Sequence, residues 1–256
     1  MMENRGACDL KLIENRIFQG GKCIMSELDD LLDQIKSKYA VEIVPLKIGD
    51  KTLKLLQIKD LEEYIADLVE GGSVPILDLP FWAKVWESSF LLAYFLGRRP
   101  VVLGQRMLEI GGGIGAVGIY AAMCGHNVTI TDINEDALLF ARANVLLNGV
   151  ARAQVQKLDW NEANLPDPYD VIVGAEVIYD RESYPLLVNF LRRAIVPKGM
   201  IFLAKNANLH APKFFVELTQ YFEFKQNVQT IGSGEDAQKI ELFAIRLKAD
   251  GKGMGN

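Results

Sequence analysis

The sequence of residues 106–248 predicts an α/β fold built on a largely parallel sheet. Short apolar runs alternate there with segments of helical periodicity, a pattern typical of βαβ units. A glycine cluster, GGGIG at 111–115, follows the first apolar run and precedes a helical segment. Two further apolar runs flank GSGEDA near the end of the chain and predict a terminal hairpin. With 256 residues, the chain is long enough to bury a full core.

Apolar spacing and glycine stops place the elements of this part in order. The long helix, for example, has apolar residues at Ala137, Leu138, Ala141 and Val145 and ends at Gly149. We expect strands at 106–110, 127–132, 151–160, 169–178 and within 196–205, helices at 115–125, 133–149, 183–195 and 211–222, and hairpin strands at 222–231 and 238–247.

The first 80 residues are less regular. They predict a helix at 26–39, a hairpin at 39–58 around Gly49-Asp50 and a helix at 59–72. Three aromatic residues and an apolar helix follow within 80–100. We expect residues 1–80 to form an α+β cap on a domain at 81–248, and residues 249–256 to form a disordered tail.

Composition excludes several classes of protein. Half of the residues are hydrophobic and 24% are charged, as in an ordinary globular protein. No apolar run is long enough to span a membrane, and the first residues lack the apolar segment of a secretory signal. Three cysteines at unrelated spacings are typical of reduced thiols, so we expect a cytoplasmic protein. The two histidines are too few for a histidine-rich metal site, and we expect no metal.

The net charge of −5 argues against nucleic acid as a partner. All of this excess lies in residues 1–80, which hold 15 acidic and 10 basic side chains. Its densest part is DLEEYIADLVE at 60–70. This stretch is either a solvated helix face or a surface that attracts a basic substrate.

The glycine cluster indicates a ligand site, because glycines let the backbone turn sharply and approach a ligand at a helix N-terminus. Two interpretations fit it. Gly113, Gly115 and Gly118 match the GxGxxG pattern of a dinucleotide site. Glu109, followed by glycines at 111, 113 and 115, instead suits a positively charged nucleoside, since a carboxylate there would repel a diphosphate.

Three positions downstream support a nucleoside site. Asp132 ends the second strand, where a carboxylate can accept hydrogen bonds from ribose hydroxyls. Asp159 and Trp160 follow the third strand, where they can meet an adenine ring. Ala175 and Glu176 end the fourth strand at the carboxyl edge, where open α/β sheets bind their ligands.

These features together resemble a class I, seven-β-strand methyltransferase that uses S-adenosylmethionine (SAM), over about residues 80–248. Two further segments are similar to methyltransferase family 16, the protein-lysine branch. One is FWAKVWESSFLLAYFL, which contains Trp86, and the other is Glu176-Val177-Ile178-Tyr179, which matches [DE]-x-x-[YF]. The resemblance implies a Rossmann-like sheet ordered 3-2-1-4-5-7-6, with strand seven antiparallel and helices on both faces.

The resemblance also implies which residues form the site. Glu176 and Tyr179 would face the methyl acceptor. The expected cofactor-binding residues, from the sequence and the resemblance together, are Trp86, Glu109, Gly111, Gly112, Gly113, Asp132, Asp159, Trp160 and Ala175.

The favoured function is methyl transfer from SAM to a lysine amine of a protein substrate. Three alternatives remain: a methyltransferase acting on a small molecule beneath the cap, an NAD-dependent oxidoreductase, and a catalytically silent SAM-binding module. The sequence does not indicate an oligomeric state.

Overall fold

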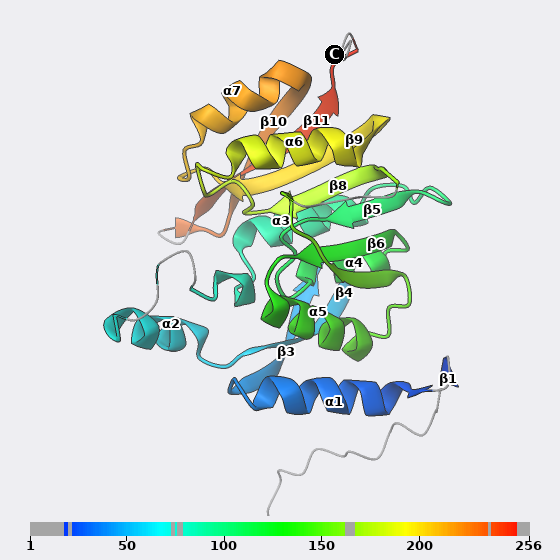
Figure 1. The fold of residues 1–256 in the computed structure, drawn as a ribbon, viewed down its shortest axis with the longest axis vertical. Helices are drawn as coiled ribbons and strands as arrows, with labels where there is room; N and C mark the ends of the chain where they lie inside the picture. Colours follow the sequence, from blue (N-terminus) through cyan, green and yellow to red (C-terminus); the bar gives the residue numbers. More distant parts are fainter. Residues whose placement is uncertain are drawn as a thin grey trace, which may run out of the picture.

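A twisted sheet of seven strands forms the centre of the computed structural model, which describes residues 18–19, 22–72, 75, 79–161, 167–234 and 237–249 (Figure 1). Its strands are β5 (Arg106–Glu109), β6 (Asn127–Asp132), β7 (Ala153–Lys157), β8 (Tyr169–Ala175), β9 (Ile195–Asn206), β10 (Phe222–Ile231) and β11 (Gln238–Leu247). They lie in the order β10-β11-β9-β8-β5-β6-β7. The strands from β5 to β9 pair in parallel, and β11 is antiparallel to both of its neighbours. Numbered along the chain, this is 3-2-1-4-5-7-6, so the expected topology is confirmed.

Helices cover both faces of the sheet. They are α3 (Glu87–Gly97), α4 (Ala116–Met123), α5 (Glu135–Leu147), α6 (Tyr184–Ala194) and α7 (Pro212–Tyr221). Buried residues of α3, α4 and α5 share one core with Val171 and Val173 of β8. Those of α6 and α7 share a second core with Ile172. Alternate residues of β8 thus face opposite cores, which explains why residues 171–175 of this strand are all apolar.

The N-terminal part contains β1 (Phe18–Gln19), β2 (Lys22–Cys23), α1 (Ile24–Lys36), β3 (Val41–Ile48), β4 (Lys51–Ile58) and α2 (Leu61–Glu70), followed by the short 3₁₀ helix η2 (Phe81–Ala83). The hairpin turns at Gly49-Asp50 as expected, and Gly49 has a φ of 58°. The β1–β2 pair was not predicted. Buried leucines of β4 belong to the same core as α3, α4 and α5. The division into a cap at 1–80 and a domain at 81–248 stays a prediction, and nearly all of the expected tail lies outside the described residues. Within the described ranges, no helix is long and apolar enough to cross a membrane.

Asn144 of α5 and Asn148, the residue directly after α5, bind the edge of β4 as a neighbouring strand would. Leu56 N donates to Asn144 Oδ1 at 2.6 Å, and Asn144 Nδ2 donates to the carbonyls of Leu56 at 3.2 Å and Ile114 at 3.0 Å. One turn later, Asn148 exchanges bonds of 2.9 and 2.8 Å with the backbone of Lys54. Four residues of helix rise about 6 Å and two residues of strand advance about 6.6 Å, so the spacings match.

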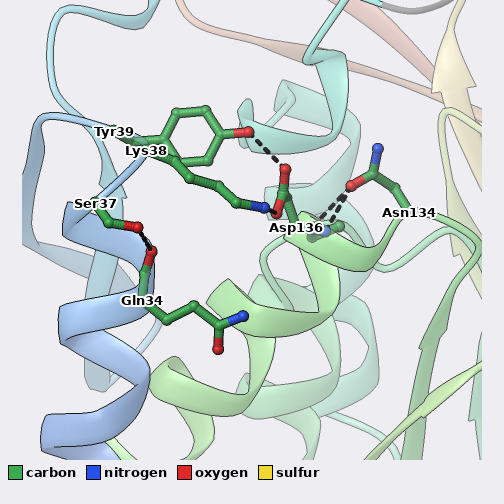
Figure 2. Close-up of polar contacts among 7 residues, drawn as sticks. Gln34, Ser37, Lys38, Tyr39, Asn134 and Asp136 are labelled. Carbon is green, nitrogen blue, oxygen red and sulfur yellow. Dashed lines mark hydrogen bonds and ion pairs between the residues drawn. The ribbon is translucent and has the colours of Figure 1, made fainter.

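The segment that follows α1 is joined to the beginning of α5 (Figure 2). Lys38 Nζ and Tyr39 Oη contact the two carboxylate oxygens of Asp136 at 2.6 and 2.7 Å. Asn134 Oδ1 caps α5 by accepting from the backbone N–H groups of Asp136 and Ala137. The N-terminal part is therefore attached to the helix that follows β6, next to the expected ribose-binding position.

Replacement of Asn144 by alanine should lower the free energy of unfolding by about 3 kcal/mol, since it leaves the buried backbone groups of Leu56 and Ile114 without partners. Urea denaturation measures this loss. Asn148→Ala is the matched control: it removes the same side chain one turn away, where the contacts with Lys54 are solvent-exposed, and should cost at most about 1 kcal/mol. Equal losses in the two variants would contradict this account.

Candidate functional site

The carboxyl ends of four parallel strands bring most of the predicted site residues to one edge of the sheet. The glycine cluster follows β5, and Asp132 is the last residue of β6. Asp159 lies two residues beyond β7, and Ala175 is the last residue of β8. Strands β7, β6, β5 and β8 are neighbours in this order, so these positions form a continuous row.

The glycine loop, residues 111–115, has a backbone conformation that residues with side chains could not easily adopt. Gly111, Gly113 and Gly115 have φ values of 57°, 53° and 87°, in the left-handed region that L-residues rarely adopt. A Cβ on Gly113 would collide with the backbone carbonyl of Trp82, and one on Gly111 would lie 2.8 Å from a methyl of Val177. The loop is therefore packed closely beneath η2 and the segment after β8.

Two buried carboxylates anchor the loop and the first turn of α4, which follows it. Asp132 Oδ2 accepts from Gly113 N at 2.9 Å, and Glu109 Oε2 accepts from Gly118 N at 2.9 Å. Burial raises the pKa of Glu109 to about 8, opposed by the Gly118 N–H and assisted by the charge of Asp132. Burial likewise raises the pKa of Asp132. Glu109 supports the start of α4 from within the core, and the expected contact of its charge with a cofactor stays a prediction.

Glu176 combines a strained backbone with a buried carboxylate oxygen that makes no well-formed hydrogen bond among the described residues. Its φ is 53°, unusual for a residue with a side chain. Glu176 Oε1 accepts from Asn206 N at 2.8 Å, whereas neither Glu176 Oε2 nor Ser88 Oγ makes a hydrogen bond of good geometry within the described residues. Burial raises the pKa of Glu176, and the nearby Ser88 hydroxyl and Asn206 N–H lower it. Such an oxygen is poised to accept a hydrogen bond from a ligand.

The remaining predicted residues differ in their surroundings. Tyr179 is 62% exposed, beyond the end of β8. Asp159 accepts from Asn161 N at 2.8 Å, and the carbonyl of Trp160 accepts from Arg193 at 3.1 Å. Trp86 donates from Nε1 to the carbonyl of Phe81 at 3.3 Å and has Lys84 Nζ 5.1 Å from its ring centre. These contacts of Trp86 lie along its own segment.

The structure adds two residues that the sequence did not single out for the site. Ile133 directly follows Asp132 and is 58% exposed, so an apolar surface stands beside the ribose position. Its signal in the sequence is an apolar residue immediately after a strand-ending acid. Trp82 meets the glycine loop through its backbone, for which no sequence signal exists. Among the described residues, no group of three or more histidine, cysteine or acidic side chains could hold a metal ion.

The sheet order and the glycine loop are those expected of a class I SAM-dependent methyltransferase. The structure is similar to the tRNA (uracil-54, C5)-methyltransferase of Pyrococcus abyssi, solved with S-adenosyl-L-homocysteine, with a TM-score of 0.52 and 21% identity over 80% of this chain and 44% of that one. It is also similar to the YcgJ protein of Bacillus, with a TM-score of 0.51 and 11% identity over 61% of this chain and 98% of that one. These likenesses show the fold alone.

Within that class, the chain belongs to the lysine methyltransferase family, whose model matches residues 81–221. It is 38% identical to the protein N-lysine methyltransferase METTL21A of Danio rerio, over 56% of this chain and 70% of that protein. It is 34% identical to EEF1A lysine methyltransferase 3 of Xenopus tropicalis, over 55% of this chain and 66% of that protein. The matches thus span about two thirds of these relatives. Membership favours the nucleoside interpretation of the glycine cluster over the dinucleotide one, and SAM is the cofactor.

Glu109→Gln should remove much of the pH dependence of stability. The pKa of Glu109 is about 8 in the folded protein against an ordinary 4.5, so folding retains a proton that the unfolded chain releases. This stabilisation is complete below the ordinary pKa and is lost as the pH rises through the folded pKa. Between about pH 5.5 and about pH 8, the wild type should lose about 3 kcal/mol more than the variant in urea denaturation. The exposed Glu182→Gln serves as control, and parallel curves for wild type and Glu109→Gln would refute the assignment.

Gly113→Ala should abolish or strongly weaken SAM binding, by about tenfold or more in calorimetry. A matched control is Gly149→Ala, because Gly149 has a similar φ of 62° but nothing within 4 Å of its Cβ position. Both variants bear the same backbone strain, about 1 kcal/mol, and only Gly113→Ala also meets the Trp82 carbonyl. Wild-type affinity in Gly113→Ala, with circular dichroism showing both variants folded, would contradict the role of the loop.

Proposed function

We propose that the protein transfers a methyl group from SAM to the side-chain amine of a lysine in a protein substrate. The observation that carries this proposal is Glu176 Oε2, a buried oxygen at the carboxyl edge of β8, one strand from the glycine loop, which makes no hydrogen bond of good geometry among the described residues. Family membership supports lysine as the acceptor, and relatives named as protein lysine methyltransferases support a protein substrate. A cytoplasmic location stays a prediction from the sequence.

The residues at the sheet edge fit SAM chemically. Asp132 offers a carboxylate to ribose hydroxyls, and the exposed side chain of Ile133 offers an apolar surface to the adenine ring. Asp159 would accept from the adenine amino group. We also assign to this site Trp86, Gly111, Gly112, Gly113, Trp160 and Ala175. When bound, SAM supplies an electrophilic methyl group on a sulfonium.

Glu176 and Tyr179 would position the acceptor. A lysine amine attacks only when neutral, although its ordinary pKa is about 10.4. Glu176 Oε2 would accept a hydrogen bond from this amine and direct its lone pair. Burial raises the pKa of Glu176, so its carboxylate is a stronger proton acceptor than an exposed one. The Tyr179 hydroxyl would provide a second contact. The lysine nitrogen forms a bond to the methyl carbon as the carbon–sulfur bond breaks. The proton that the amine loses passes to Glu176 or to solvent.

The test is incubation of the purified protein with methyl-labelled SAM and cell lysate, followed by mass spectrometry of proteins and small molecules. Methyl-lysine in proteins is expected. Label found only in small molecules would contradict a protein lysine as the acceptor and would support the alternative of a small-molecule methyltransferase. Absence of calorimetric binding by both SAM and its demethylated product would refute the proposed function altogether.

Glu176→Gln should lower kcat by about 100-fold or more, because the amide accepts a proton far less readily than the carboxylate. The dissociation constant for SAM should stay unchanged, since Glu176 is assigned to the acceptor. Glu182→Gln makes the same change at an exposed position and should retain wild-type kcat. Unchanged turnover in Glu176→Gln would remove Glu176 from the mechanism.

A further inference from the structure

A groove of about 570 Å³ lies between the β3–β4 hairpin, the beginning of α2 and the segment that enters α3. We call it the hairpin groove. Its apolar surface includes Leu46, Leu61, Val85 and Phe90. Most of its lining comes from residues 42–63, which precede the family match at 81–221. The groove is therefore formed mainly by a part of this chain that the family model does not include.

The charges that line the hairpin groove are strongly unbalanced. Four carboxylates, Glu42, Asp60, Glu62 and Glu63, face a single base, Lys84. Lys84 Nζ pairs with Glu62 Oε1 at 3.3 Å. The structure shows no ion pair for the other three acids among the described residues. Asp60 does not use its carboxylate to cap α2. The groove consequently combines apolar surface with negative potential, which suits a basic ligand.

Helix α2 presents an incompletely covered apolar face beside this groove. Leu61, Tyr64, Ile65 and Leu68 have the spacing of one helix face, yet no described residue of α2 is fully buried. Val69 is 55% exposed. Figure 1 shows α2 at the periphery of the molecule, away from the sheet. Residues 73–78, SVPILD, contain one acid and no base, so they do not complement the charge of the groove.

We propose that the hairpin groove binds a basic segment of the methyl-acceptor protein, in which lysine or arginine residues alternate with apolar ones. One short segment of the chain connects the groove to the candidate site. Val85 lines the groove, and Ser88, three residues later, lies near Glu176. A bound segment would thus bring a neighbouring lysine of the same protein toward Glu176. Naming the partner as the methyl acceptor rests on the proposed function, whereas binding of a basic segment does not.

The test is fluorescence anisotropy with the full chain and three labelled peptides of equal length. In the first, lysine alternates with leucine; in the second, glutamate replaces lysine; in the third, serine replaces leucine. Only the first should bind tightly, and added salt should weaken it. Glu42→Lys combined with Glu63→Lys should weaken this binding at least tenfold. Asp29→Lys combined with Glu217→Lys changes the net charge equally on α1 and α7, away from the groove, and should leave binding within twofold of wild type.

Each outcome bears on one proposal at a time. The proposal for the hairpin groove would be overturned if the two double variants weakened binding equally. It would also be overturned if the serine peptide bound as tightly as the lysine–leucine peptide. Binding that appears only after removal of residues 1–17 would assign the groove to the chain's own N-terminus and overturn it also. SAM affinity, measured by calorimetry on the same variants, should not change. If SAM fails to bind while the peptide results are as expected, the proposed function is wrong, but the proposal that the groove binds a basic segment remains supported.

Discussion

Two buried carboxylates hold the glycine loop and the start of the helix that follows it, and the rest of the site depends on that loop. Glu109 and Asp132 come from the ends of the paired strands β5 and β6, and each accepts a hydrogen bond from a backbone N–H of a glycine. Glycine has little intrinsic preference among backbone conformations, so a run of glycines needs external bonds to stay in one. Burial of the two carboxylates opposes ionisation, which their raised pKa values record.

The N-terminal part also packs against the glycine loop, through Trp82. The ring of Tyr39 packs edge-on against those of Trp82 and Phe140, with centres 6.1 and 5.8 Å apart. The carbonyl of Trp82 occupies the space that a side chain on Gly113 would need. Tyr39 also donates to Asp136, four residues after Asp132. A shift of the N-terminal part would therefore disturb the loop and the ribose position together, so this part contributes to the site as well as to stability.

Much of the fold could be predicted from the sequence, because each strand of the sheet and each helix that covers it has its own pattern of apolar residues. The edge that bears the site was predictable too, since parallel strands end on the same side. The asparagine contacts were not, because Asn144 and Asn148 meet β4 across 88 and 94 residues and an asparagine inside a helix has no distinctive pattern. The direction of Glu109 was equally hidden, since an acid before a glycine loop is compatible with facing either a ligand or the core. The left-handed backbone of Glu176 arises from tertiary packing at the end of β8, which local sequence does not encode.

The placement of acidic residues separates binding of a basic substrate from the chemistry on its target lysine. Carboxylates close to an amine stabilise the ammonium form and raise its pKa, which opposes methylation. An acidic surface therefore helps to attract a lysine-rich protein, whereas beside the reacting amine only a carboxylate with a raised pKa, such as that of Glu176, can also take the proton away. Here the negative excess lies in residues 1–80, and the acids of the hairpin groove lie on the hairpin and α2 while Glu176 lies at the end of β8. With this arrangement, neighbouring basic residues of a substrate would supply the binding energy, and the target lysine would enter a site where its proton can leave.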